Sequence, residues 1–208
     1  MIERLPATPE GLAAAAALLD SGGLTAFPTD TVYGIGCRAG NAEALARIFA
    51  AKRRPAEKQV PILASSLEQA AALGYRVDDR VRRLAARWWP GPLTIVLRVE
   101  HGGDATPSLA VTQAFRVPDH RVALSLIERS GPLATSSANR SGEPETYDAD
   151  DVLVAFADDD LLDAVMDGGR VPGGVASTVV DLSEAQPRLV REGPITLEQL
   201  MEIIGRID

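Results

Sequence analysis

Residues 27–36 read FPTDTVYGIG, and the rest of the chain is organised around this stretch. The apolar run GLTAF at 23–27 predicts a short buried strand, which Pro28 ends because proline has no N–H to donate. Thr29, Asp30 and Thr31 then supply small polar side chains, and glycines close the stretch. Open α/β sheets present ligand-binding groups on loops of this kind. A tight turn after a strand gives the same local pattern.

Helices and strands alternate through the remaining sequence. We predict helices at 9–19, 42–52, 67–73, 77–89, 119–129, 146–156 and 197–204, with capping boxes at Ser66–Gln69 and Thr196–Gln199. Strands are predicted at 60–64, 93–99, 114–117, 133–135, 177–182 and 187–191, and 161–166 is ambiguous. The alternation favours a single α/β domain over residues 1–208, with a mixed sheet flanked by helices.

Composition narrows the class of protein. The chain has 208 residues and a net charge of −8, which argues against sequence-independent binding of nucleic acid. Its one cysteine, Cys37, excludes an internal disulfide and favours a reducing compartment. No run approaches the ~20 apolar residues of a membrane-spanning helix, and the N-terminus has no signal-peptide pattern. We therefore expect a cytoplasmic protein without a membrane partner.

Cations and hydroxyl groups form the candidate site. Lys52 and Arg54 flank a loop before Pro55, where they can converge on a polyphosphate or simply favour the end of a helix. Thr135, Ser137 and Asn139 follow a short strand and form either a turn network or a ligand cradle. Arg116 lies in a short apolar strand and needs either a ligand or a structural partner such as Asp30 or Asp119. Further candidates are Ser177, Thr178 and Arg191, which would otherwise be a capping hydroxyl and a solvated charge at a sheet edge.

Several catalytic motifs are absent from the sequence. It contains no GxxxxGK[ST], GxGxxG or GxSxG pattern, and no plausible pair of nucleophile and base. Hydroxyls and cations bind and orient anions, so the residues favour chemistry by positioning and charge stabilisation rather than through a covalent intermediate.

Taken together, the motifs resemble one family. FPTDTVYGIG, KRRP, WPGPLT, FRVPDH, TSSANRSG and STVVDL occur in this order between about 23 and 191, as in the YrdC/Sua5 family of threonylcarbamoyl-AMP synthases. The chain resembles the short, single-domain form. The resemblance implies a YrdC-like twisted sheet with a concave ligand face. It also implies a nucleotidyltransferase that joins L-threonine, bicarbonate (or CO2) and ATP, with Mg2+, into threonylcarbamoyl-AMP and pyrophosphate.

The resemblance also implies roles for individual residues. Lys52 and Arg54 would be catalytic and would stabilise charge on the phosphates, and their replacement by Ala should abolish activity and leave the fold intact. The ATP-binding residues would be Lys52, Arg54, Thr112, Ser137, Asn139 and Arg191. The threonine-binding residues would be Thr31, Arg116, Thr135 and Ser177. Leu63 stands about where long-form members carry a threonine-contacting His, which marks the subtype. No metal ligand among the protein side chains is identified.

The family context suggests partners and alternatives. The product would pass to a threonylcarbamoyl transferase complex that modifies adenosine 37 of tRNA, and weak contact with RNA is a secondary expectation. The main alternative is an RNA-binding, ribosome-maturation module without synthase activity, which the acidic charge disfavours. Carbamoyl-AMP formation from carbamoyl phosphate and a paralogue without threonine use are further alternatives. The loop at 101–107 is a candidate lid.

Overall fold

The computed structural model describes residues 1–53, 59–100, 111–158 and 160–208. These residues form a ten-stranded sheet and seven helices. The strands are β1 (Glu3–Pro6), β2 (Thr25–Pro28), β3 (Tyr33–Arg38), β4 (Ile62–Leu63), β5 (Leu93–Arg98), β6 (Thr112–Arg116), β7 (Leu133–Ser137), β8 (Ala164–Asp167), β9 (Thr178–Asp181) and β10 (Arg188–Arg191). The helices are α1 (Pro9–Asp20), α2 (Ala42–Ala51), α3 (Leu67–Ala72), α4 (Asp79–Trp88), α5 (Arg121–Ser130), α6 (Ala149–Ala155) and α7 (Leu197–Ile204).

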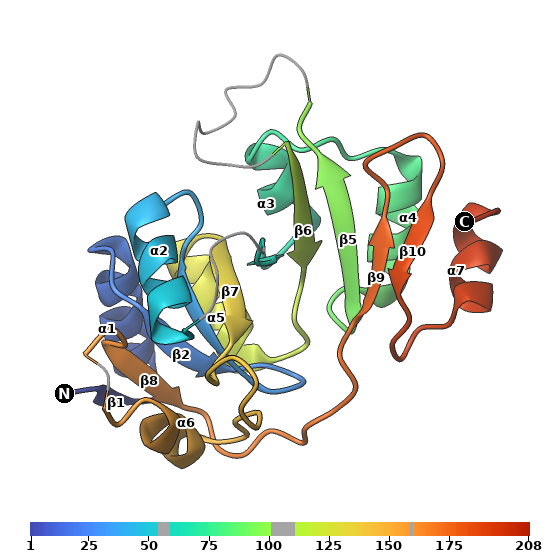
Figure 1. The fold of residues 1–208 in the computed structure, drawn as a ribbon. Coiled ribbons are helices and arrows are strands. Elements are labelled where there is room, and N and C mark those ends of the chain that lie inside the picture. Colours follow the sequence, from blue (N-terminus) through green and yellow to red (C-terminus); the bar gives the residue numbers. More distant parts are fainter. Residues whose placement is uncertain (54–58, 101–110, 159) are drawn as a thin grey trace.

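The sheet is mixed, as the sequence predicts. Its strand order is β1-β8-β2-β3-β7-β4-β6-β5-β9-β10. The pairs β1/β8, β2/β8, β4/β6 and β5/β9 are parallel, and the other pairs are antiparallel. Figure 1 shows that the N-terminal strands lie at one end of the sheet and β9 and β10 at the other. The N- and C-terminal parts of the chain therefore form opposite ends of one continuous sheet.

The two faces of the sheet are covered unequally. Successive side chains of a strand point to opposite faces. One face, here called the covered face, carries Ile35, Ala134 and Ile95, which pack beneath α2 and α6 at one end and α3, α4 and α7 at the other. The other, here called the pocket face, carries Phe27 and Leu63 beneath α1 and α5. The helices on this face pack from β1 as far as Leu63 of β4, which leaves part of the face available for a ligand.

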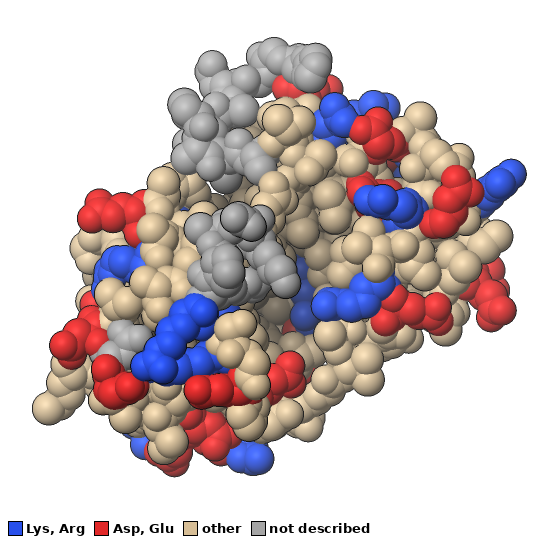
Figure 2. All heavy atoms as spheres, viewed as in Figure 1, with Lys and Arg blue, Asp and Glu red and all other residues tan. Residues whose placement is uncertain are grey.

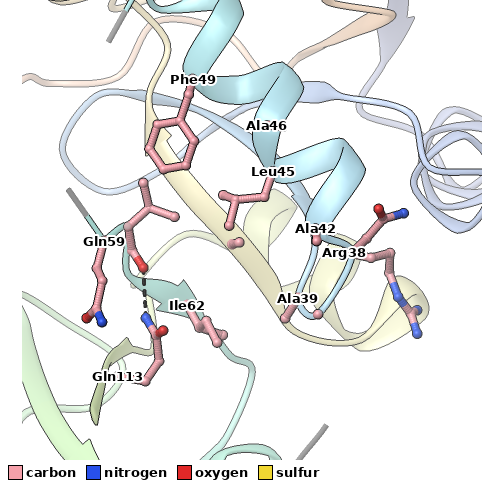
Figure 3. A pocket seen from close by; sticks show the side chains of 13 residues that line it. Arg38, Ala39, Ala42, Leu45, Ala46, Phe49, Gln59, Ile62 and Gln113 are labelled. Carbon is pink, nitrogen blue, oxygen red and sulfur yellow. Dashed lines mark hydrogen bonds between the residues drawn. The ribbon is translucent and has the colours of Figure 1, made fainter. Parts of the chain in front are cut away.

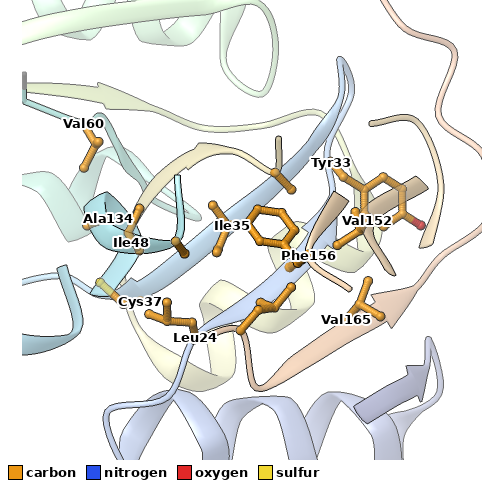
Figure 4. Packing of buried hydrophobic residues seen from close by; sticks show 14 of the residues in the cluster. Leu24, Tyr33, Ile35, Cys37, Ile48, Val60, Ala134, Val152, Phe156 and Val165 are labelled. Atoms are coloured by element: carbon orange, nitrogen blue, oxygen red, sulfur yellow. The ribbon is translucent and has the colours of Figure 1, made fainter. Parts of the chain in front are cut away.

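The largest hydrophobic cluster lies on the covered face (Figure 4). Ile35 of β3 and Ile48 of α2 are fully buried, as is Phe156 next to α6. Cys37 lies in the same cluster, and burial raises the pKa of its thiol to about 12. A thiol with this pKa stays protonated at neutral pH, so Cys37 acts as a small core residue and is no nucleophile.

Most helix starts follow the predicted caps, and one does not. The side chains of Thr8 and Asn41 accept hydrogen bonds from the first turns of α1 and α2. Thr196 and Gln199 form the predicted capping box at α7. The capping box predicted at Ser66 is wrong: its side chain makes no cap bond, and the Gln69 side chain instead accepts from the backbone of Ser65.

The structure also corrects several strand boundaries. Residues 33–38, assigned to a glycine-bounded loop, form strand β3, so the loop after Phe27 is only four residues long from 29 to 32. β1 was missed because its short sequence shows no alternation that distinguishes it from coil. The strand expected at 60–64 is only Ile62–Leu63, and α6 starts three residues later than predicted. The ambiguous stretch at 161–166 contains the start of β8.

Among the described residues, no helix is long and apolar enough to cross a membrane.

Candidate active site

A pocket of about 410 Å³ lies on the pocket face where no helix covers the sheet. Its walls come from the loop between β2 and β3, the strands β3 to β7 and β9, and the segment that leads into β9. Hydroxyl side chains dominate the lining, with two arginines and one carboxylate. The polar and charged residues among its described lining are Thr29, Thr31, Gln59, Thr94, Arg116, Thr135, Ser136, Ser137, Glu145, Ser177 and Arg191.

Two glycines of β3 lie at or beside the pocket, and Gly34 is one of its lining residues. In the antiparallel pairing of β3 with β7, Gly34 lies opposite Ser137 and Gly36 lies opposite Thr135. A Cβ atom at position 34 would lie 2.8 Å from Cγ2 of Thr135. At position 36 it would lie 2.9 Å from the Phe27 ring. Both glycines therefore allow neighbouring groups to approach closely, and they do so within a strand rather than in a loop.

Arg116, the last residue of β6, is held by two acceptors. Its Nε donates to the carbonyl oxygen of Gly91 at 3.1 Å, and its Nη2 donates to Oδ2 of Asp30 at 2.5 Å. The ion pair is largely buried, with side-chain exposures of 10% for Arg116 and 16% for Asp30. Of the two partners that the sequence suggested, the structure selects Asp30. A buried charge needs such compensation, because an unpaired guanidinium is costly to desolvate.

Linked hydroxyl groups build a further part of the lining. The Thr94 and Ser177 hydroxyl oxygens are 2.8 Å apart within hydrogen-bond distance, and both residues are buried. Arg191 donates from Nε and Nη2 to the carbonyl oxygen of Ser177, at 3.0 and 2.8 Å. In the loop after β2, the Thr29 and Thr31 hydroxyl oxygens are 3.1 Å apart. These bonds fix the hydroxyl groups in place, which is what recognition of a small polar ligand requires.

Lys52 organises the loop after β7. Its ammonium group donates to the carbonyl oxygens of Ser137 and Asn139, at 2.6 and 2.5 Å. The Ser137 hydroxyl in turn donates to the Asn139 side chain at 2.6 Å. Lys52 is 3% exposed, so its charge is nearly removed from solvent. The contacts of Lys52 stabilise the end of β7, where Ser137 lines the pocket, and the loop that follows it.

The structure brings most of the predicted site residues together. Those that line the pocket are Thr31, Arg116, Thr135, Ser137, Ser177 and Arg191. Lys52 and Asn139 adjoin it through Ser137. Thr112 begins β6 and is not among the described lining residues. Arg54 and the candidate lid at 101–107 lie outside the described residues. The ligand roles expected of the site residues stay predictions.

Sequence reasoning missed several lining residues. Thr94 lies between Leu93 and Ile95 in an otherwise apolar strand, and a buried hydroxyl in that position was a usable signal. Gln59 and Glu145 also line the pocket, but both lie in irregular segments where no periodicity marks them. Only the folded chain places them beside β7.

The described residues contain no group of three or more His, Cys, Asp or Glu side chains that could hold a metal ion. Glu145 is the single carboxylate among the described lining residues of the pocket. This donor set fits Mg2+ that arrives with a nucleotide, since Mg2+ is commonly bound by phosphates, waters and one or two carboxylates.

A second pocket lies on the covered face between α2 and strands β4 and β7 (Figure 3). It has a volume of about 300 Å³ and mainly apolar walls, in which Leu45 and Phe49 face Ile62. Gln113 donates to the carbonyl oxygen of Val60 at 2.7 Å, and the Arg38 guanidinium pairs with Asp20 at 3.0 Å. Its walls offer little to stabilise an anion, so the hydroxyl-lined pocket is the candidate active site.

Charges of both signs are interspersed on the face of the molecule drawn in Figure 2. Acidic and basic side chains alternate there, and no extended basic stripe crosses the described part of that face. A phosphate backbone is bound mainly through such stripes. The surface in this view therefore gives no support to a primary role in binding RNA.

A family model named Sua5_yciO_yrdC, described as telomere recombination, matches residues 17–193. The threonylcarbamoyl-AMP synthase of Pyrococcus abyssi is 42% identical over 201 residues, which cover 93% of this chain and 57% of that protein. The putative threonylcarbamoyl-AMP synthase of Mycobacterium leprae is 38% identical over 198 residues, which cover 94% of this chain and 88% of that protein. This chain thus spans little more than half of the first relative and most of the second.

Solved structures agree with this match. The crystal structure of P. abyssi Sua5 complexed with L-threonine superposes with a TM-score of 0.86 at 39% identity, covering 100% of this chain and 62% of that one. The crystal structure of Escherichia coli YciO superposes with a TM-score of 0.79 at 23% identity, covering 96% and 98% of the two chains. The second likeness shows the fold alone.

Proposed function

Because the chain belongs to the Sua5/YciO/YrdC family, we propose that it is a threonylcarbamoyl-AMP synthase. The reaction combines L-threonine, bicarbonate or CO2, and ATP into threonylcarbamoyl-AMP and pyrophosphate. Relatives that bear this name match more than nine-tenths of the chain, at 93% and 94% coverage. A relative of known structure has been solved with L-threonine, one of the substrates.

One observation carries the proposal for this chain. A single pocket places the Arg116 guanidinium and an array of fixed hydroxyls on the same face as Ser137, whose loop Lys52 holds. A guanidinium recognises a carboxylate, and hydroxyl and amide groups orient a polar ligand. The pocket thus offers a place for an amino acid beside a loop suited to a nucleotide.

The residues have separate roles in the proposed reaction. Arg116 binds the threonine carboxylate, while Thr31, Thr135 and Ser177 orient the rest of the molecule. The neutral threonine amine attacks the carbon of CO2 and releases one proton, which gives a carbamate. A carbamate oxygen then attacks the α-phosphorus of ATP, and pyrophosphate leaves. Holding both substrates in reacting geometry is the main catalytic device, since no described lining residue is a strong nucleophile.

The nucleotide end of the site uses the remaining predicted residues. Ser137, Asn139 and Arg191 would bind ATP, with main chain near Thr112 and the side chain of Arg54 completing the site. Lys52 fixes the backbone of the loop to which the nucleotide binds. Glu145, the carboxylate among the described lining residues, would be the protein ligand for Mg2+ that arrives with ATP, and this ion would neutralise part of the phosphate charge.

In this proposal, the product is the substrate of another enzyme complex. Threonylcarbamoyl-AMP is an activated acyl group, and a threonylcarbamoyl transferase complex would use it to modify adenosine 37 of tRNA. The protein would then work in the cytoplasm, where it would contact RNA weakly or not at all.

Pyrophosphate release from ATP and bicarbonate tests the proposal, with L-threonine present, with it absent, and with L-serine in its place. Release that requires L-threonine, with threonylcarbamoyl-AMP detected by mass spectrometry, supports the synthase. ATP binding without threonine-dependent release would contradict it and indicate another acceptor. Salt-sensitive binding of RNA with no binding of ATP would contradict it in favour of the RNA-binding alternative.

A further inference from the structure

We propose that Asp30 is a positioning residue, which holds the Arg116 guanidinium so that its free edge receives the carboxylate of the amino-acid substrate. The inference rests on the proposed function, because it takes an α-amino acid as the ligand of the pocket. It adds that Asp30 stays bound to Arg116 when the substrate is present, so the substrate carboxylate joins the ion pair and does not replace Asp30.

The hydrogen bonds of Arg116 leave one edge of its guanidinium available. A guanidinium has five N–H donors in a rigid plane. Gly91 accepts from Nε, and Asp30 accepts from one of the two N–H groups of Nη2. Nη1 has no hydrogen-bond partner among the described residues, and Arg116 lines the pocket. The Nη1 side of the guanidinium can therefore bind a carboxylate while Asp30 remains in place.

Burial opposes the departure of Asp30. Its side chain is 16% exposed, and its other carboxylate oxygen, Oδ1, is buried and has no hydrogen-bond partner among the described residues. If a substrate displaced the Oδ2 bond, both oxygens would be left without a partner in a site that water hardly reaches. Separating a buried ion pair in this way is strongly unfavourable. The substrate therefore binds to the pair as it stands.

Arg116 is the cation with which Asp30 pairs at neutral pH. His120 is close enough to Asp30 to interact electrostatically, but burial lowers its pKa, and its Nδ1 atom is buried with no partner in the described part of the chain. A neutral imidazole at neutral pH does not compete with Arg116 for the carboxylate. Among the described residues, Arg116 is the one cation that forms an ion pair with Asp30. The contact thus fixes one guanidinium in one orientation.

Titration calorimetry with L-threonine tests the inference without turnover. Asp30→Ala removes the acceptor, and we expect the Kd for L-threonine to rise about tenfold or more, since hydrogen bonds to charged groups contribute this much. Asp30→Asn keeps an acceptor for Nη2 and should restore most of the affinity, to within about threefold of the wild type. Binding of ATP should change little in both variants, because Asp30 acts through Arg116.

A matched control is Asp78→Asn. Asp78 forms an ion pair with Arg80 at 2.7 Å that is similarly shielded, with both side chains 21% exposed, and neither residue lines the candidate active site. Its variant should bind L-threonine like the wild type. Thermal melting identifies variants that do not fold, and Asp30→Asn keeps the test valid if Asp30→Ala fails.

The direction in which the Kd for L-threonine changes in the Asp30 variants tests the inference. An unchanged Kd for L-threonine in the Asp30 variants would show that the pair is merely structural, and a lower Kd would show that Asp30 competes with the substrate. Either result overturns the inference, as does a wild type that binds no L-threonine. The proposed function fails separately, when L-threonine binds to the wild type but pyrophosphate is not released.

Discussion

The ammonium nitrogen of Lys52 lies 2.6 Å from the carbonyl oxygen of Ser137, so this lysine reaches from the end of α2 to the last residue of β7. The bond joins segments that are 85 residues apart in the sequence. One expectation from the sequence was that replacing Lys52 would leave the fold intact, and this stays a prediction. A buried side chain that satisfies two backbone carbonyls contributes to stability as well as to the site.

Lys52→Ala should lower the free energy of unfolding by about 1–3 kcal/mol, because two buried carbonyl oxygens lose their donor. We also expect threonine-dependent pyrophosphate release to fall at least about tenfold, as the loop with Ser137 and Asn139 loosens. Urea unfolding and the release assay measure the two effects. Arg53→Ala is the control: Arg53 is 65% exposed and pairs with Asp158 at 3.3 Å, so its loss should have little effect on either quantity. Equal stability of the two variants would contradict the structural role of Lys52.

Gly34→Ala should impair threonine binding through sterics alone. The new methyl group would lie 2.8 Å from Cγ2 of Thr135, which must shift from its place in the pocket wall. Crowding of this kind typically costs about 1–3 kcal/mol, so we expect lower stability and a KM for L-threonine raised several-fold. Gly174→Ala is the control, because Gly174 also lines the pocket but has no atom within 4 Å of an added Cβ. If both variants had the wild-type KM, the close approach of β3 and β7 would be irrelevant to binding.

Two sequence-predicted capping boxes should respond differently to alanine. Thr196→Ala removes a real cap at α7 and should lower the free energy of unfolding by about 0.5–2 kcal/mol. Ser66→Ala removes a side chain that makes no cap bond at α3 and should cost less than about 0.5 kcal/mol. Urea unfolding of both variants under identical conditions checks the difference. A larger loss in the Ser66 variant would contradict the arrangement at the start of α3.

His120 should make stability depend on pH near neutrality. Burial lowers its pKa in the folded protein below the ordinary value of 6.5, while Asp30 and Asp119 act in the opposite direction. Between the two pKa values the unfolded chain binds more protons, so stability rises with pH across this window. The contribution is present above pH 6.5 and is lost as the pH falls toward the folded pKa.

We therefore expect His120→Gln to lose less stability than the wild type when the pH falls from about 7.5 to about 5.5. The comparison is a difference between two proteins, so the titrations of the other groups largely cancel. Urea unfolding across this pH range measures it. Parallel stability curves for the two proteins would show that His120 titrates alike in the folded and unfolded states.

Local sequence patterns predicted much of the fold because they act over a few residues. Asn41 caps α2 and Thr196 caps α7, as their spacing to the following residues predicts. The alternating apolar residues of 93–99 mark β5. β3 was missed for the same reason: its pattern in 33–38 includes two glycines, which normally signal a turn. Pairing with β2 and β7 overrides that local signal.

By itself, the sequence determined the family motifs, the mixed α/β class and the residue types of the site, since these depend on the identity and spacing of neighbouring residues. Only the tertiary structure decided which groups meet. It paired Arg116 with Asp30, 86 residues away, and joined Thr94 to Ser177 across parallel strands. It also brought the Lys52 ammonium group to the backbone carbonyls of Ser137 and Asn139. Such contacts depend on strand order and register, and these are set by burial of the whole sheet rather than by any one segment.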